Sequence, residues 1–157
     1  MPGCFNQLPH ERKCVMLNLE SFHKSVKQLE EALLYCNSDL AKDEKLAHHL
    51  RAAAIQAFEF TYEISFKTLL RYLKDTNPDD LDFSNIGFKD VIREGIGKGL
   101  LSVELDQWCE FRKNRGTTSQ TYNETKAQEV FSQIPDFLQE AKFLLAQIEK
   151  QQHSMVN

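Results

Sequence analysis

The sequence predicts an all-α protein, an up-and-down bundle of four to five helices that forms one domain. Apolar residues recur at spacings of three and four along most of the chain, as on the buried face of an amphipathic helix. A long central stretch, about 43–74, contains neither Gly nor Pro. The segments between the periodic stretches are rich in turn-forming residues. At 157 residues the chain has the size of one domain with one hydrophobic core.

The first helix is predicted over about 19–37, with Asn18 as its N-cap. Its apolar stripe consists of Phe22, Val26, Leu29, Leu33 and Cys36. Before it, residues 1–16 show no apolar period and are expected to form a flexible leader. The helical domain is expected to span 17–150, and residues 151–157 to form a frayed tail.

The stretch 43–74 is predicted to form the longest helix, because its residues are mostly good helix formers. Aromatic and apolar residues alternate with polar ones over 58–66, which would also suit a half-buried strand. Helix is favoured, because the helical period continues on both sides and the turn residues that a strand needs are absent. Large side chains around its circumference predict neighbours on more than one side, at the centre of the bundle or at an oligomer interface.

Three more helices are predicted after the turn signature at 77–80. A short one covers about 86–98 and ends at a group of glycines. The next, which Ser102 can cap, carries Trp108 and ends near 116–119. Thr121-x-x-Glu124 has the form of a capping box, which opens a last helix that continues to about 150 and is kinked at Pro135.

Composition excludes several classes of function. The net charge of −4 and a pI near 5.7 argue against a broad positive surface, so no DNA binding is expected. No apolar run is long enough to span a membrane and the first twenty residues resemble no signal peptide, so a cytoplasmic protein is expected. The four cysteines form no Cys-x-x-Cys pair, and His48 and His49 point to different sides of a helix. Neither a metal site nor a cofactor is predicted.

Two clusters of polar residues are candidate sites. Glu59, Glu63 and Lys67 follow one another at intervals of four and so share one face of the long helix. Paired carboxylates can bind a cation or act in acid–base chemistry, but Glu63 followed by Lys67 is also an ordinary ion pair within a helix. Because structural ion pairs are far commoner than sites, the residues alone favour the structural interpretation.

The second cluster is the basic run 112–115, at a predicted helix end, followed by a glycine and three hydroxyl residues. Cations stabilise the last turn of a helix, which is one explanation of Arg112 and Arg115. The other is that guanidinium groups, hydroxyls and the start of the next helix form a site for a phosphate or another anion. The local chemistry leaves both open.

Both clusters fall within segments that resemble a known family. The helix Ile55-Gln-Ala-Phe-Glu-Phe-Thr-Tyr-Glu-Ile-Ser-Phe-Lys-Thr-Leu69 is similar to the signature helix of the nucleotidyltransferase substrate-binding protein family, within the HEPN superfamily. The resemblance continues through Lys89–Glu94, Gly99-Leu-Leu101, Trp108 and the segment Arg115-Gly-Thr-Thr-Ser-Gln-Thr-Tyr-Asn-Glu124. It extends from about Leu17 to Ile148.

This resemblance implies a helical bundle that dimerises and pairs with a separately encoded minimal nucleotidyltransferase. The catalytic carboxylates would lie in that partner, and this chain would form part of the pocket for the acceptor substrate. The substrate- or nucleotide-binding residues predicted on these grounds are Glu59, Glu63, Lys67, Arg112, Arg115, Ser119, Gln120 and Tyr122. No catalytic residue is predicted.

Other branches of the superfamily suggest an alternative, a ribonuclease toxin whose nucleotidyltransferase partner is the antitoxin. Those branches resemble this chain at an Arg-x4–6-His-x-Tyr motif, which falls here on Arg115, Gln120 and Tyr122. Glutamine has no ionisable proton near neutral pH, so Gln120 cannot act as the general acid or base that a histidine provides. The alternative is therefore either a toxin or an inactive relative of one. A plain helical interaction protein without a small-molecule site is the third possibility.

Overall fold

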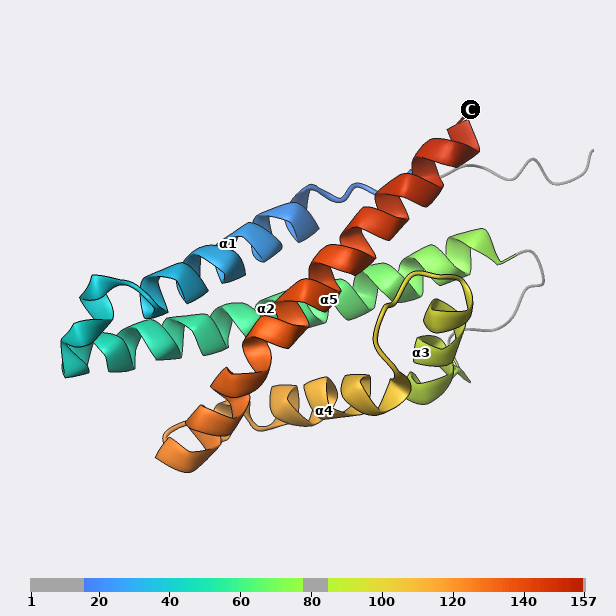
Figure 1. Cartoon of the computed structure of the whole chain (residues 1–157). Helices are drawn as coiled ribbons and strands as arrows, with labels where there is room; N and C mark the ends of the chain where they lie inside the picture. Colours follow the sequence, from blue (N-terminus) through green and yellow to red (C-terminus); the bar gives the residue numbers. More distant parts are fainter. Residues whose placement is uncertain (1–15, 78–84, 157) are drawn as a thin grey trace, which may run out of the picture.

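The computed structural model describes residues 16–77 and 85–156, and within these ranges the chain is helical with no strand. The α-helices are α1 (Glu20–Cys36), α2 (Glu44–Thr76), α3 (Phe88–Gly97), α4 (Leu105–Gly116) and α5 (Glu124–Val156) (Figure 1). Two short 3-10 helices, η1 (Asp39–Lys42) and η3 (Thr118–Gln120), lie between them. The predicted all-α bundle is confirmed. The predicted leader lies outside the described residues, apart from Met16.

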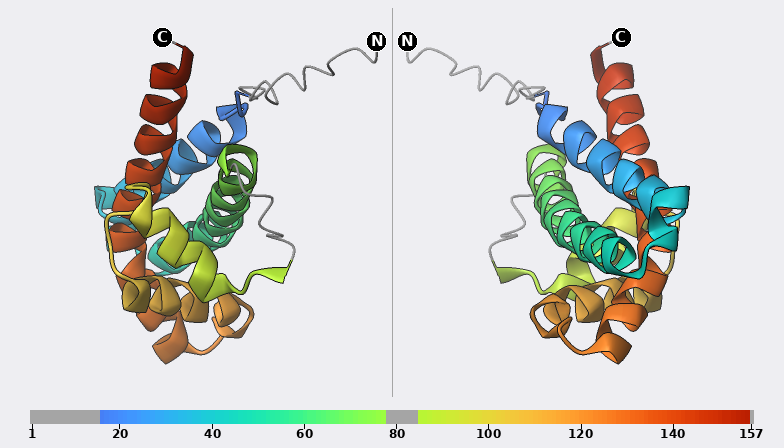
Figure 2. Two further views of the ribbon diagram at one scale, coloured as in Figure 1. Left: turned by 90° about the vertical axis from the view of Figure 1, so that its right-hand side faces the viewer. Right: turned by 90° about the vertical axis from the view of Figure 1, so that its left-hand side faces the viewer.

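Helices α1 and α2 run side by side in opposite directions (Figures 1 and 2). The stripe predicted for α1 faces the core, with Phe22, Val26, Leu29 and Leu33 buried and Cys36 half-buried. The buried hydroxyl of Thr61 donates to the carbonyl of Ala57 at 2.7 Å and lies 3.2 Å from the carbonyl of Ser25 on α1. The polar groups at this helix contact are therefore satisfied.

Helix α2 is the central element of the bundle. It contacts every other α-helix and both 3-10 helices. Residues 58–66 are helical throughout, so the alternation does not mark a strand. Phe58 and Tyr62 are buried, whereas Phe60 is exposed. Neighbours on several sides of this helix were predicted, and the contacts confirm them.

The connection from α3 to α4 depends on one glycine. Gly99 has a φ of 73°, which favours glycine because it has no Cβ, and the amide of Leu100 donates to the carbonyl of Gly95 at 2.9 Å. The prediction that Ser102 caps α4 is wrong. The amide and hydroxyl of Ser102 both donate to the buried carboxylate of Glu140, and the helix begins three residues later at Leu105.

Helix α5 begins and ends differently from what the sequence predicts. Its first turn is capped by Asn123, whose side-chain oxygen accepts from the amide of Thr125 at 3.0 Å, so the predicted capping box is not formed. The hydroxyl of Thr121 instead donates to the carbonyl of Thr118. The helix contains Pro135 and extends past the predicted end to Val156. There the side chain of Gln152 accepts from the amide of Leu17 at 2.6 Å.

An aromatic cluster forms the core where α2, α4 and α5 meet. Phe137 lies at its centre, with its ring centroid 5.1 Å from that of Phe58 and 5.3 Å from that of Phe111. Tyr62 and Trp108 complete the cluster at 5.9 and 6.2 Å from the same ring. These contacts fix α4 against α2 and so determine which outer residues of the two helices meet.

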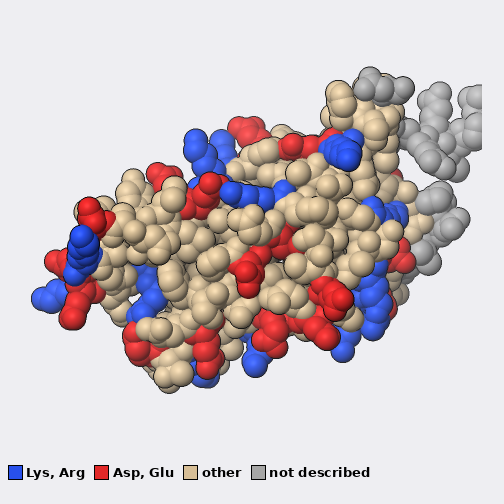
Figure 3. Space-filling view, viewed as in Figure 1, with Lys and Arg blue, Asp and Glu red and all other residues tan. Residues whose placement is uncertain are grey.

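The face of the molecule drawn in Figure 3 carries charges of both signs. Acidic and basic side chains alternate over the face drawn in Figure 3, without an extended area of one sign. Among the described residues no helix is long and apolar enough to cross a membrane. Nor do those residues contain a group of three His, Cys, Asp or Glu side chains that could hold a metal ion.

Candidate functional site

The two polar clusters that the sequence presents separately form one site at the outer edge of the contact between α2 and α4. Arg115, in the last turn of α4, directs its guanidinium towards α2. Its Nη2 lies 3.2 Å from Oε1 of Glu59 and donates a short hydrogen bond to Oε1 of Glu63. Because Glu59 and Glu63 are one helical turn apart, a single guanidinium can contact both carboxylates. We call Arg115, Glu59 and Glu63 the arginine clamp.

The clamp is partly exposed. The side chain of Arg115 is 27% exposed, and those of Glu59 and Glu63 are 39% and 45% exposed. The hydrogen bond from Arg115, helped by its charge and by that of Lys67, lowers the pKa of the Glu63 carboxyl below its ordinary value. Glu63 is therefore held as a carboxylate, and the guanidinium of Arg115 is already neutralised within the chain.

Two donors beside the clamp are unsatisfied. Nε of Arg115 and Nδ2 of Asn114 are buried and have no hydrogen-bond partner among the described residues. The Nη1 group of Arg115 lies 3.4 Å from the hydroxyl of Thr118, which itself donates to the carbonyl of Arg115. Buried donors without acceptors are unfavourable, so this end of α4 favours an additional oxygen acceptor.

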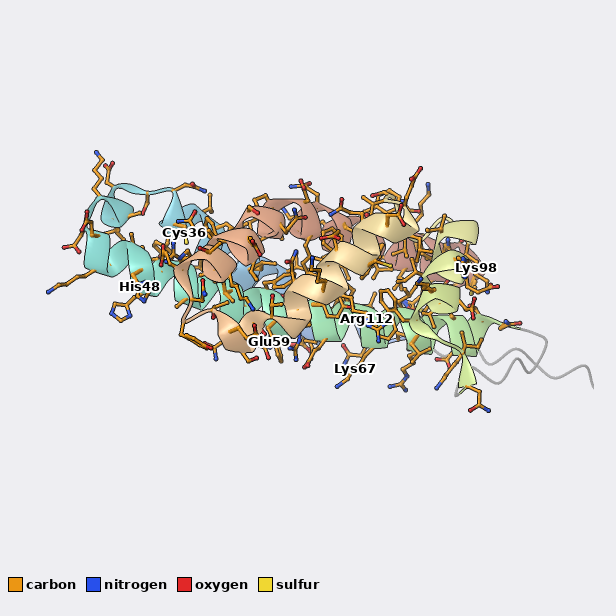
Figure 4. The ribbon with its side chains drawn as sticks, turned by 90° about the horizontal axis from the view of Figure 1, so that it is seen from below. Cys36, His48, Glu59, Lys67, Lys98 and Arg112 are labelled. Carbon is orange, nitrogen blue, oxygen red and sulfur yellow. The ribbon has the colours of Figure 1, made fainter. Side chains whose placement is uncertain are left out.

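Two further cations lie near the clamp and take part in no ion pair of the described residues. The ion pair between Glu63 and Lys67, which the sequence suggests, is not among those of the described residues, because Glu63 binds Arg115 instead. Lys67 is exposed and lies on the same face as Arg112 (Figure 4). The guanidinium carbon of Arg112 lies 4.5 Å from the ring centroid of Phe88 on α3, a cation–π contact.

Tyr62 lies beneath this edge. It is 7% exposed, and burial raises the pKa of its hydroxyl to about 12, although the charges of Arg112 and Arg115 act in the opposite direction. No hydrogen bond of the described residues involves this hydroxyl. Tyr62 thus belongs to the aromatic core and is close enough to the two arginines for their charges to act on its hydroxyl.

The positions of the ribonuclease-like motif have different partners. The side-chain oxygen of Gln120 accepts a short hydrogen bond from Nζ of Lys126. Tyr122 is 90% exposed, and Ser119 is also exposed. No hydrogen bond or ion pair of the described residues joins Arg115, Gln120 and Tyr122 to one another. The structure therefore brings together Glu59, Glu63 and Arg115 from the predicted set, with Lys67 and Arg112 beside them. Ser119, Gln120 and Tyr122 form no hydrogen bond or ion pair of the described residues with these five.

Several contacts around the site could not be identified from the sequence. Arg51 of α2 donates to Glu124 at the start of α5 over 2.7 Å, and its side chain is only 17% exposed. Glu140, which is 1% exposed, accepts from Ser102 and from the indole of Trp108. The only sequence signal for Glu140 is a charged residue beside the apolar stripe of the last helix. Arg51 carries no such signal, because its partner is distant in the sequence.

The edge between α2 and α4 combines hydrogen-bond acceptors with donors. It offers carboxylate oxygens as acceptors and guanidinium, ammonium and amide groups as donors. An acid–base reaction near neutral pH needs a group that titrates there, which Gln120 cannot supply.

Comparison with known proteins agrees with this architecture. The family model described as nucleotidyltransferase substrate binding protein like matches residues 17–150. The fold is similar to that of a Haemophilus influenzae protein described as having the fold of a substrate binding domain of a nucleotidyltransferase. That match has a TM-score of 0.78 and 35% sequence identity, and covers 84% of this chain and 99% of the other.

Two further relatives are similar. A Thermus thermophilus protein of known structure matches with a TM-score of 0.62 and 29% identity, over 81% of this chain and 98% of its own. A Haemophilus influenzae protein named as a probable ribonuclease HepT is 43% identical over 99 residues, which are 63% of this chain and 67% of the relative. The family match covers nearly all of the helical bundle, and the chain therefore belongs to the nucleotidyltransferase substrate-binding protein family.

Proposed function

We propose that this chain is a non-catalytic, substrate-binding subunit that pairs with a separately encoded minimal nucleotidyltransferase. The observation that supports this most is the family match over residues 17–150, nearly the whole bundle, to proteins described by substrate binding. The site agrees with it, because the edge between α2 and α4 concentrates groups that donate and accept hydrogen bonds.

In this proposal the reacting groups belong to the partner and this chain holds the substrate. Glu59 and Glu63 are half-exposed acceptors that can receive hydrogen bonds from the hydroxyl or amino groups of an acceptor substrate. Arg115, Arg112 and Lys67 are donors for its negatively charged or carbonyl groups. Positioning of this kind accelerates transfer without chemistry by the binding subunit.

We also propose that the chain forms a homodimer. Phe60, on the outer face of α2, is 54% exposed although it lies near the middle of that helix. A second copy of the chain that packed on this face of α2 would bury the Phe60 ring.

Pairing is tested by coexpressing this chain with a tagged minimal nucleotidyltransferase from the same genome. The proposal predicts that affinity purification of the tagged enzyme retains this chain in a stoichiometric amount at physiological salt. A tagged enzyme of equal size from an unrelated family is the control. Retention by both enzymes, or by neither, would contradict the proposal.

A ribonuclease toxin, or an inactive relative of one, is the second candidate. The relative named as a probable ribonuclease HepT favours it, as does the presence of Arg115 and Tyr122 at motif positions. Gln120 argues against activity, and so does its bond to Lys126. This candidate predicts growth arrest or RNA cleavage upon expression, abolished by Arg115→Ala. We expect neither effect in the wild-type chain.

A further inference from the structure

The cations at the edge between α2 and α4 differ in their availability. The guanidinium of Arg115 contacts two carboxylates, so any anion that binds it must compete with Glu59 and Glu63. Arg112 and Lys67 take part in no ion pair of the described residues, and both are exposed. An incoming anion therefore meets less competition at Arg112 and Lys67 than at Arg115.

Arg112 is also preorganised. Its guanidinium lies on the ring of Phe88, which in turn packs against Phe66 of α2 with 5.5 Å between the ring centroids. Three helices, α2, α3 and α4, thus hold one cationic side chain in place. An arginine stacked on an aromatic ring loses less conformational freedom when it binds a ligand, and its outer face remains open for planar, bidentate recognition of a phosphate.

The surroundings restrict the kind of ligand. Lys67 lies on the same face of the molecule as Arg112 (Figure 4), and Glu59 lies further along α2. Two carboxylates one and two turns from Lys67 repel anions from the clamp, so the positive part of this edge is short. A short positive segment suits the phosphates of one nucleotide better than an extended polyanion, whose backbone would continue into the carboxylates.

We infer that Arg112, Lys67 and the supporting ring of Phe88 form a phosphate subsite for a free nucleotide, beside the arginine clamp and not at Arg115. This inference rests on the proposed function, in which the chain shares a substrate pocket with a nucleotidyltransferase. It assigns the phosphates to one end of the edge. Glu59 and Glu63 at the other end then remain available for the donors of the ligand.

The test is a calorimetric titration of the purified full-length chain with ATP at low salt, with pyrophosphate as competitor. Arg112→Ala is expected to weaken binding about tenfold or more, as loss of a charge-assisted hydrogen bond does. Arg112→Lys keeps the charge without the planar guanidinium, so its affinity for ATP should lie between those of the wild type and of Arg112→Ala. Lys113→Ala is the matched control, because it removes the same charge from the neighbouring exposed position of α4. It should leave affinity within about twofold.

Other results would overturn the inference. Failure of the wild-type chain to bind ATP would do so, as would equal effects of Arg112→Ala and Lys113→Ala, which indicate diffuse surface charge. If Arg115→Ala were the only variant that weakened ATP binding, the phosphate subsite would lie at the arginine clamp. Binding of a short single-stranded RNA that pyrophosphate does not displace would replace the free nucleotide by a polynucleotide.

Failure of this inference is distinguishable from failure of the proposed function. Retention by the tagged nucleotidyltransferase is measured on the same variants, and melting temperatures show whether each variant is folded. A chain that pairs with the enzyme but does not bind ATP would contradict only the phosphate subsite. A chain that binds ATP through Arg112 but does not pair would contradict the proposed function.

Discussion

The contact between α2 and α4 has two sides that follow different physical rules. On the inner side, Phe58, Tyr62, Trp108 and Phe111 surround Phe137 and exclude water. On the outer side, within about one helical turn on each helix, Arg115 and its carboxylates are partly exposed. Burial makes the inner contacts strong and insensitive to salt, whereas solvent weakens the outer ones. Stability is therefore expected to depend on the inner side, and binding on the outer side.

The largest effect is expected for Phe137→Ala. Its ring is fully buried and packs against four other aromatic rings, so the truncation leaves a cavity that α5 cannot fill without moving. The free energy of unfolding should fall by about 3–5 kcal/mol. Chemical denaturation measures it, with Phe143→Ala on the same helix as a less buried comparison. Equal losses at the two positions would contradict a core centred on Phe137.

A smaller effect is expected at high pH, through Tyr62. Its folded pKa, about 12, is above the ordinary value of 10.0, so its contribution is complete below pH 10 and is lost as the pH rises through 12. A pKa difference of one between the folded and unfolded chain corresponds to about 1.4 kcal/mol, which sets an upper limit of roughly 3 kcal/mol on this contribution. Tyr62→Phe cannot ionise.

The comparison to measure is the difference in unfolding free energy between wild type and Tyr62→Phe from pH 8 to 12. We expect the difference to be small at pH 8 and to grow in favour of Tyr62→Phe at alkaline pH. A difference that stays constant over this range would mean that the hydroxyl is not buried as the structure indicates.

The smallest effect on stability is expected for Arg115→Ala. The clamp is partly exposed, and such ion pairs contribute at most about 1 kcal/mol.

Glu63, whose pKa is lowered, contributes stability above the ordinary carboxyl pKa and loses it as the pH falls through the folded value. The acid-induced loss of stability should therefore be shallower in Glu63→Gln. Thermal melts at pH 3 to 7 measure both effects, and a loss with Arg115→Ala as large as that with Phe137→Ala would contradict the distinction between the two sides.

The inner side was largely predictable from the sequence and the outer side was not. Apolar spacing identified the helices and most of the buried positions, because burial of a helix face leaves a periodic trace. The predicted helix caps at Ser102 and Thr121 were wrong. Both side chains have capping chemistry, but they bond to Glu140 and Thr118 instead. Local propensity cannot anticipate a partner that tertiary packing provides.

The partners within the candidate site could not be predicted from the sequence either. Spacing placed Glu59 and Glu63 on one face, and helix-end chemistry drew attention to Arg115. The contact between Arg115 and Glu63 spans 52 positions in sequence and depends on the packing of α4 against α2. The sequence instead suggested Lys67 as the partner of Glu63, because it is the local alternative.

Whether this chain is the binding subunit of a nucleotidyltransferase can be decided from the molar mass of the species that the two proteins form together. Size-exclusion chromatography with light scattering is applied to this chain, to the minimal nucleotidyltransferase and to their mixture at micromolar concentration. A binding subunit gives a species in the mixture whose mass requires both chains and which neither protein forms alone. Two separate peaks with the masses of the isolated proteins would contradict it.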